Sequence, residues 1–277
     1  MIDVLTSATL KHLREDWWNE TFTDFLMAAL APRPGTRILN IGCGTGTAEV
    51  RMGRRHLSQL RLVSIDIRVD RVAAAARQAA GHNQRLACAA GSAAALPFGN
   101  ASFDSVYAVA VLQHVLDLSG SVKEMARVTR PGGRVLAVEP DNSARHWYCS
   151  EPAGAAAYEA RNHFFAAVRR ATLAMPDDSV GPQMPALFSA SGIEPVEVRL
   201  FPVSSVHLSP PPDEVWISRR AAAEAVVARA ASPDVTQAGR DYLAALAAYE
   251  QTARTVTGAF VEIQHTMLFA TVGQRES

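Results

Sequence analysis

Short apolar runs alternate with segments of helical periodicity through the first half of the chain. The apolar runs that predict buried strands lie at 38–41, 61–66, 85–90, 103–111 and 134–139. Between them, helical patterns occur at 47–57, 69–80 and 119–129. Strands and helices that alternate in this way predict a parallel sheet with helices on both faces.

Strands and helices do not alternate in this way in the second half of the chain. Predicted helices lie at 151–175, 183–191, 213–231 and 234–254, and predicted strands at 196–203 and 265–272. A further helix is predicted over 6–30. The expected fold is therefore α/β, a doubly wound, mostly parallel, seven-stranded Rossmann-like sheet. Helices are added at the N-terminus, after the fifth strand, and between the sixth and seventh strands.

Three glycines follow the first predicted strand at alternate positions, Gly42, Gly44 and Gly46, and a helix begins at Thr47. Glycines let the backbone turn sharply and approach a ligand closely, and a helix start offers free N–H groups. This pattern predicts a loop that holds a nucleotide-type ligand. Nicotinamide dinucleotide enzymes place the third glycine three residues after the second, so the spacing here disfavours a dehydrogenase.

Asp66 ends the second predicted strand, about twenty residues after the last glycine. An acidic residue at this place in doubly wound folds accepts hydrogen bonds from ribose hydroxyls. The alternative is that Asp66 caps the helix predicted over 69–80.

Composition narrows the classes of function. The 277 residues carry a formal net charge of zero, which gives no support for a protein that binds nucleic acid through phosphates. Cys43, Cys88 and Cys149 are few and far apart, which is typical of reduced thiols and not of a disulfide framework or a zinc site. No run has membrane-spanning length and no signal-peptide core is present. We therefore expect a soluble cytoplasmic protein without a metal and without a membrane partner.

A set of motifs occurs in order: 40–46 (NIGCGTG), Asp66, 91–98 (GSAAALPF), 103–104 (FD), 111–115 (VLQHV) and 126–135 (ARVTRPGGRV). Together they resemble a class I S-adenosylmethionine-dependent methyltransferase of the small-molecule type, the group that includes the quinone methyltransferases. The resemblance covers about residues 36–140. It implies S-adenosylmethionine as cofactor and S-adenosylhomocysteine as product, with no metal.

The resemblance also implies roles for individual residues. The backbone of Gly42, Cys43, Gly44 and Gly46 would pack against the methionine part and ribose. Asp66 would bind the ribose hydroxyls and Ile67 would pack on the adenine. Ser92 and Ala93 would face the adenine amino edge, and Val109 would line the methionine end of the pocket.

Two positions depart from the family pattern. Relatives usually carry an acidic residue at the position of Asn40 and often an aspartate at that of Ser92. Asn and Ser still form hydrogen bonds, but without the charge assistance of a carboxylate. We expect weaker individual contacts, and two explanations stay open: a lower cofactor affinity, or ordinary variation within the family.

His114 is the leading candidate for a catalytic base, because it follows the fourth strand and its ordinary pKa suits proton removal. The alternative is that it shapes the pocket or holds the local turn. Glu139 and Asp141 are further candidates, as bases or as partners of a cationic acceptor. The expected substrate pocket contains residues Trp18, Gln113, Asp141, Trp147 and Tyr148. The sequence at 112–114 lacks the Pro-Pro-Tyr or Pro-Pro-Phe signature of enzymes that methylate nucleobase amines.

One methyltransferase domain is expected over 1–277. It comprises a helical lid at 1–34, the cofactor-binding core at 36–140, and helical insertions at 141–180 and 210–255 that cap the substrate or form a homodimer face. The expected reaction moves a methyl group to O, N or activated C of a small metabolite. Abundant Ala and Arg with few Lys suggest a GC-rich genome and specialised metabolism. The alternatives are a quinone-type C-methyltransferase and a non-catalytic cofactor-binding module.

Overall fold

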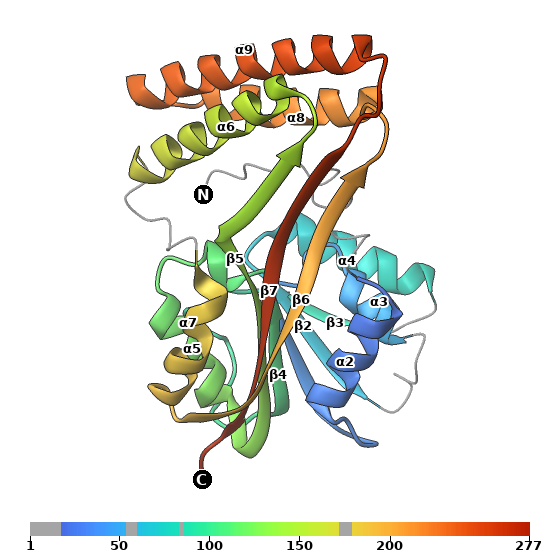
Figure 1. Ribbon diagram of the computed structural model, residues 1–277. Coiled ribbons are helices and arrows are strands. Elements are labelled where there is room, and N and C mark those ends of the chain that lie inside the picture. Colours follow the sequence, from blue (N-terminus) through green and yellow to red (C-terminus); the bar gives the residue numbers. More distant parts are fainter. Residues whose placement is uncertain (1–17, 54–59, 83–85, 172–178) are drawn as a thin grey trace. The chain divides into compact units, whose positions relative to one another are not determined.

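The computed structural model describes residues 18–53, 60–82, 86–171 and 179–277, and its sheet has seven strands in the order β3-β2-β1-β4-β5-β7-β6 (Figure 1). The strands are β1 (Arg37–Ile41), β2 (Arg61–Asp66), β3 (Ala87–Ala90), β4 (Phe103–Val109), β5 (Thr129–Cys149), β6 (Ile193–His207) and β7 (Glu262–Arg275). The helices are α2 (Glu20–Leu30), α3 (Thr47–Gly53), α4 (Val69–Gly81), η2 (Leu112–His114), α5 (Leu118–Val128), α6 (Pro152–Ala171), α7 (Val180–Ser189), α8 (Asp213–Val227) and α9 (Pro233–Thr255). The predicted α/β fold with seven strands is confirmed.

The pairings of β1 with β2 and β4, of β2 with β3, and of β4 with β5 are all parallel. In the pairing of β1 with β2, Asn40 lies opposite Ser64 and Ile41 opposite Ile65. Parallel strands in register place their carboxyl ends at one edge of the sheet, which is where ligands bind in open α/β folds. The segments that follow β1, β2, β3 and β4 therefore meet at this edge.

Helices cover both faces of this sheet, with α2, α3 and α4 on one side and α5 and α7 on the other (Figure 1). The strands are apolar on both faces, as expected for a buried parallel sheet, and residues of α5 and α7 such as Met125 and Phe188 are fully buried against them. Asn19 caps α2 by accepting a 2.9 Å hydrogen bond from the backbone N–H of Phe22. The part of the predicted 6–30 helix before Trp18 lies outside the described residues.

β5 is much longer than the strand predicted over 134–139. It begins at Thr129 and continues to Cys149, through the turn residues Pro131, Gly132 and Gly133 and through the polar segment after Glu139. The prediction was wrong at both ends because turn-forming residues and polar side chains do not prevent a chain from pairing along a neighbouring strand.

The described chain falls into two compact units. The first, the sheet unit, comprises the described residues of 18–144, 179–201 and 267–277. The second, the helical unit, comprises 145–171 and 202–266. The predicted lid and substrate cap, with the homodimer alternative, stay predictions.

The helical unit has its own core, formed by α6, α8 and α9. Phe164, Trp216, Leu246 and Tyr249 are fully buried in it. The same core contains an ion pair: the Arg219 guanidinium donates two hydrogen bonds to Glu262, of 2.5 and 3.1 Å, and the Tyr249 hydroxyl donates a third of 2.6 Å. Burial raises the pKa of Glu262, but the contact with Arg219 outweighs burial and leaves the pKa below its usual range.

Glu262→Ala is expected to lower the free energy of unfolding by about 3–5 kcal/mol, because it leaves the mostly buried guanidinium of Arg219 unpaired. Urea denaturation followed by tryptophan fluorescence measures this change. Arg68→Ala, which breaks the exposed ion pair between Arg68 and Asp70, serves as the control and should leave the midpoint unchanged. Equal midpoints for the two variants would contradict the assignment of Glu262 to the core.

Candidate functional site

The glycine loop after β1 is anchored to the end of β2 by the main chain. The N–H groups of Gly42 and Cys43 both donate to the carbonyl oxygen of Ile65, at 2.7 and 2.9 Å. Gly42, Gly44 and Gly46 have φ angles of 74°, 56° and 91°. This left-handed region is open to glycine at little cost, whereas side chains with a Cβ are strained in it. The three glycines therefore permit the loop conformation itself.

Close packing around the loop excludes side chains at two of the glycines. A Cβ on Gly42 would lie 2.3 Å from a methyl carbon of Val111, and a Cβ on Gly46 would lie 3.0 Å from the Cα of Ala75. The loop thus packs between the segment after β4 and helix α4. Cys43 is buried in the loop, and burial raises the pKa of its thiol well above the usual range.

Asp66 links the loop to the start of the segment after β2. One carboxylate oxygen accepts from the N–H of Gly44 and the other from the N–H of Arg68, both at 2.9 Å. Arg68 is the N-cap residue of α4, so Asp66 is not the cap. A carboxylate oxygen has two acceptor sites, so each oxygen keeps one for a ligand hydroxyl. These two acceptors fit the two adjacent hydroxyls of a ribose, each of which would donate to one carboxylate oxygen.

The other predicted cofactor residues surround the same edge of the sheet. Ile67 follows Asp66 and is 58% exposed, so its apolar side chain is available to a flat ligand group. Val109 ends β4 and is 9% exposed. Ser92 follows β3 and its hydroxyl accepts a 3.3 Å hydrogen bond from the N–H of Ala94, while Ala93 packs on the core.

The segment that carries Ser92 is fixed from helix α5. Glu124 accepts a 2.7 Å hydrogen bond from the N–H of Leu96, and Arg127 donates to the carbonyl oxygens of Leu96 and Phe98. Glu124 and Arg127 also form an ion pair. These contacts hold the backbone after β3 in place, and the sequence analysis did not identify them.

Asn40 is buried beneath the glycine loop and contacts an acidic residue. Its amide donates a 2.6 Å hydrogen bond to Oε1 of Glu49 on α3, and the Ser64 hydroxyl donates to the same oxygen, also at 2.6 Å. Glu49 is 1% exposed. Burial raises the pKa of Glu49, against the hydrogen bonds from Ser64 and Asn40, which lower it. Glu49 does not stand out in the sequence, because an acid in the first turn of a helix is common where it faces the helix dipole.

Glu139 holds the backbone after β4. This side chain is fully buried, and its carboxylate accepts from the N–H groups of Val111 and Leu112 at 2.9 and 2.8 Å and of Gln113 at 3.2 Å. Ala110, immediately before them, has a φ of 54°, which is strained for a residue with a Cβ. The three hydrogen bonds stabilise this strained segment. The geometry therefore favours a positioning role for Glu139 over the predicted role of base.

His114 ends η2, directly after the residues that Glu139 holds, and its side chain is exposed. Gln113 accepts a 3.1 Å hydrogen bond from the amide of Asn142 on β5. These side chains follow the carboxyl end of β4, so a reacting group at this edge of the sheet would meet them. Whether His114 removes a proton stays a prediction.

Asp141 is occupied by local contacts. Its Oδ1 accepts from the hydroxyls of Ser143 and Ser179, at 2.6 and 2.8 Å, and from the N–H of Ser143. Burial raises the pKa of Asp141, but these hydrogen bonds outweigh burial and leave the pKa below its usual range. Trp18 is 4% exposed and its ring meets Phe22 edge-on at 5.0 Å, so most of it packs against α2.

The remaining predicted pocket residues belong to the helical unit. Trp147 packs edge-on against Tyr158, at 5.1 Å between ring centres, and the guanidinium of Arg219 lies 5.3 Å from the centre of its ring. The indole N–H of Trp147 is buried and has no hydrogen-bond partner among the described residues. Tyr148, the next residue, is 53% exposed.

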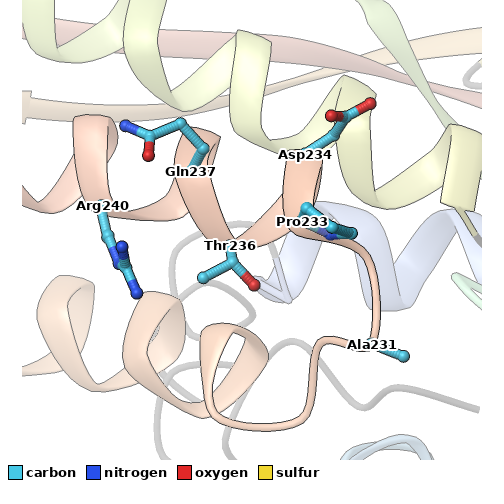
Figure 2. Close-up of a pocket in the computed structure, with 6 residues that line it drawn as sticks. All are labelled: Ala231, Pro233, Asp234, Thr236, Gln237 and Arg240. Carbon is cyan, nitrogen blue, oxygen red and sulfur yellow. The ribbon is translucent and has the colours of Figure 1, made fainter.

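A hollow of about 480 Å³ lies at the start of α9 in the helical unit (Figure 2). It is lined by Ala231, Pro233, Asp234, Thr236, Gln237 and Arg240. Most of these side chains are exposed, and none is a predicted site residue, so we assign the hollow no role. Within the described residues there is no cluster of acidic, His and Cys side chains suited to a metal, and no helix that is long and apolar enough to cross a bilayer.

Gly42→Ala is expected to destabilise the protein by about 1–3 kcal/mol, because the added methyl strains the backbone and collides with Val111. Chemical denaturation measures the loss. Gly81→Ala at the end of α4 is the matched control, since a methyl there meets no atom within 4 Å. The control should be neutral or slightly stabilising, and a loss of stability as large as that of Gly42→Ala would contradict the packing described for the loop.

Comparison with known proteins agrees with this geometry. A family model described as a methyltransferase domain matches residues 39–137. The demethylmenaquinone methyltransferase of Mycobacterium marinum is 33% identical over 135 residues, which are 49% of this chain and 53% of that relative. The 27-O-demethylrifamycin SV methyltransferase of Amycolatopsis mediterranei is 31% identical over 143 residues, covering 48% of this chain and 53% of that relative. The chain thus spans about half the length of these curated relatives.

Solved structures with the same fold extend over nearly the whole chain. A geranyl diphosphate methyltransferase in complex with S-adenosylmethionine aligns with a TM-score of 0.52 at 16% identity, covering 97% of this chain and 88% of that chain. The cyclase SpnF aligns with a TM-score of 0.54 at 19% identity, covering 99% and 85%. At these identities the likeness shows the fold alone. The strand order, the glycine loop and the family match thus agree: residues 39–137 are similar to a methyltransferase domain.

Proposed function

We propose that this protein transfers a methyl group from S-adenosylmethionine to an oxygen, nitrogen or activated carbon atom of a small organic metabolite. The observation that carries the proposal is the pairing of the glycine loop with Asp66 through the 2.9 Å hydrogen bond from Gly44. It brings a loop without side chains and a carboxylate with free acceptor sites to one edge of the sheet. The family match over residues 39–137 supports the same reaction.

The residues present suit this cofactor part by part. Asp66 accepts from the ribose hydroxyls, Ile67 offers an exposed apolar surface to the adenine, and Val109 lines the methionine end. Bound S-adenosylmethionine supplies a sulfonium whose methyl group is already electrophilic. The protein's contribution is then to align the acceptor with the S–CH₃ bond and to exclude water. The side chains available for this on the sheet unit follow β4, at Gln113 and His114.

His114 is the residue that we assign to proton removal from the acceptor. It is exposed, its backbone N–H bonds to Val111, and the segment before it is held by Glu139. An exposed imidazole on a fixed backbone can reach a bound acceptor, whereas the carboxylate of Glu139 is already occupied by three N–H groups. Glu139 therefore acts through the backbone that it positions.

The substrate class rests on the relatives that the chain resembles. Their names describe methyltransferases of demethylmenaquinone and of a demethylrifamycin, both organic metabolites. By this likeness we propose a small-molecule acceptor in the cytoplasm and no nucleic acid partner. A quinone-type C-methyltransferase is one form of the proposal.

A second candidate is a protein that keeps the fold and the cofactor but does not transfer the methyl group. The likeness to the cyclase SpnF favours keeping this candidate, because a protein named for a different reaction has the same fold. The two candidates share cofactor binding and differ in turnover. Binding and methyl transfer must therefore be measured separately.

Titration calorimetry should show binding of both S-adenosylmethionine and S-adenosylhomocysteine to the protein. Asp66→Asn should weaken both affinities by about ten- to a hundredfold, because charge-assisted hydrogen bonds to the ribose are lost. Asp70→Asn removes an exposed carboxylate four residues later and should bind as the parent protein does. Failure of the parent protein to bind either molecule would overturn the proposal.

His114→Ala is expected to lower the rate of methyl transfer by about 10²–10⁴-fold while leaving cofactor affinity unchanged. The assay uses cofactor labelled in the methyl group and a panel of phenols, amines and hydroquinones. Calorimetry on the same preparation tests whether the site is intact. Full turnover in the variant would remove His114 as the base, and absence of transfer by the parent protein to every acceptor would favour the second candidate.

A further inference from the structure

Glu49 is a buried acid that the proposed reaction has not used. It belongs to α3, whose neighbouring residues Ala48, Val50 and Met52 are buried apolar side chains. Its Oε1 accepts both hydrogen bonds that the carboxyl receives, from Asn40 and Ser64. Its Oε2 is buried and has no hydrogen-bond partner among the described residues. Burying a carboxyl oxygen without a hydrogen bond lowers the free energy of unfolding. A group that is kept at this cost is a candidate for a functional role.

The two partners of Glu49 place it beneath the predicted cofactor site. Asn40 on β1 and Ser64 on β2 are opposite each other in the strand pairing. Asn40 lies two residues before Gly42, and Ser64 lies two residues before Asp66. Glu49 therefore ties the strand that leads into the glycine loop to the strand that leads into the ribose-binding carboxylate.

Among the described residues, the titratable groups that interact electrostatically with Glu49 are acids. They are Asp66 on β2, Cys43 in the loop, Cys88 on β3 and Tyr107 on β4. Burial, and after it the charge of Glu49, raises the pKa of Cys43 and Tyr107 above their usual ranges and that of Cys88 to about 11. These three acids stay neutral between pH 5.5 and 8, so they add no negative charge beside Glu49 there.

We propose that Glu49 is a positioning and specificity-determining residue of the cofactor site, whose negative charge favours the sulfonium cofactor over its uncharged thioether product. This rests on the proposed function. S-adenosylmethionine carries one positive charge on sulfur that S-adenosylhomocysteine lacks, and the two molecules are otherwise alike in charge. In a buried, weakly polarisable region a carboxylate acts on a cation over several ångströms. The preference helps product to leave after each transfer.

The proposal predicts a dependence on pH with a definite sign. A bound cation stabilises the ionised form of Glu49, so the pKa of Glu49 is lower in the complex than in the free protein. Below the free-protein pKa, binding must displace a proton from Glu49. Affinity for S-adenosylmethionine should therefore rise with pH, while affinity for S-adenosylhomocysteine changes less.

Glu49→Gln tests the role of the charge, because Gln keeps the shape and its oxygen still accepts from Asn40 and Ser64. Calorimetry at a series of pH values should show a lower ratio of the affinity for S-adenosylmethionine to that for S-adenosylhomocysteine than in the parent protein. The ratio should fall by about tenfold at pH values where Glu49 of the parent protein is ionised, and its dependence on pH should flatten. Glu159→Gln, on the exposed surface of α6, removes the same charge elsewhere and should leave the ratio unchanged.

A second variant separates charge from shape. Asn40→Asp with Glu49→Gln moves the carboxylate from the helix to the strand across a 2.6 Å contact and keeps the hydrogen bond with its direction reversed. This double variant should recover the preference for S-adenosylmethionine. Asn40→Asp alone places two carboxyls side by side and should lower the melting temperature, because one of them must stay protonated.

The outcomes are distinct. If the parent protein binds both molecules and Glu49→Gln leaves their affinity ratio and its pH profile unchanged, this inference is overturned and the proposed function stands. If Glu49→Gln does not fold, the double variant decides: recovery of the preference supports the charge, and a folded double variant without the preference overturns it. If the parent protein binds neither molecule, the proposed function itself fails.

Discussion

The site depends on one carbonyl oxygen, that of Ile65 at the end of β2, which accepts the N–H groups of Gly42 and Cys43. Two consecutive donors can reach one acceptor only if the chain curls as it leaves β1, and Gly42 has the positive φ that this curl requires. The curl directs the next N–H, that of Gly44, to Asp66. Strand pairing, loop shape and the orientation of the Asp66 carboxylate are therefore parts of one constraint.

Three carboxylates, of which Glu49 and Glu139 are buried, do much of the remaining positioning. Glu139 binds three backbone N–H groups after β4, Glu124 binds one after β3, and Glu49 joins β1 to β2. Glu139 and Glu124 fix backbone segments that follow strands, whereas Glu49 joins two strands that are already paired. The same choice gives the site a negative character, which suits a cofactor with a positive charge. Structure and electrostatic preference thus come from the same side chains.

Much of the fold could be predicted from the sequence because the parallel strands are short, apolar and bounded by turn residues. β2 was predicted with its observed limits, and the predictions for α4 and α8 began at the observed residues. The long β5, by contrast, was not recognised beyond Glu139, since its second half has polar and aromatic side chains without alternation. A local sequence pattern cannot reveal that a segment pairs with a strand more than a hundred residues away.

Some residues of the candidate site could likewise be predicted from the sequence, and others could not. The sequence indicates the glycine loop and Asp66, because glycines at 42, 44 and 46 are typical of left-handed backbone and an acid after the second strand is typical of this fold. The partners of Glu139 and Glu49 could not be predicted, since a contact across 28 residues or between a helix and two strands has no fixed spacing. Asn40 shows the limit well: the sequence presents it as a missing charge, and the structure places a carboxyl 2.6 Å from its amide.

The buried thiol of Cys43 has a chemical consequence. In the function that we propose, the loop holds an electrophilic methyl donor, and a thiolate in such a loop would compete with the acceptor as nucleophile. Burial first, and then the nearby charges of Glu49 and Asp66, keep this thiol protonated. Under the proposed function, the acids that shape the loop would therefore also keep the protein from methylating itself.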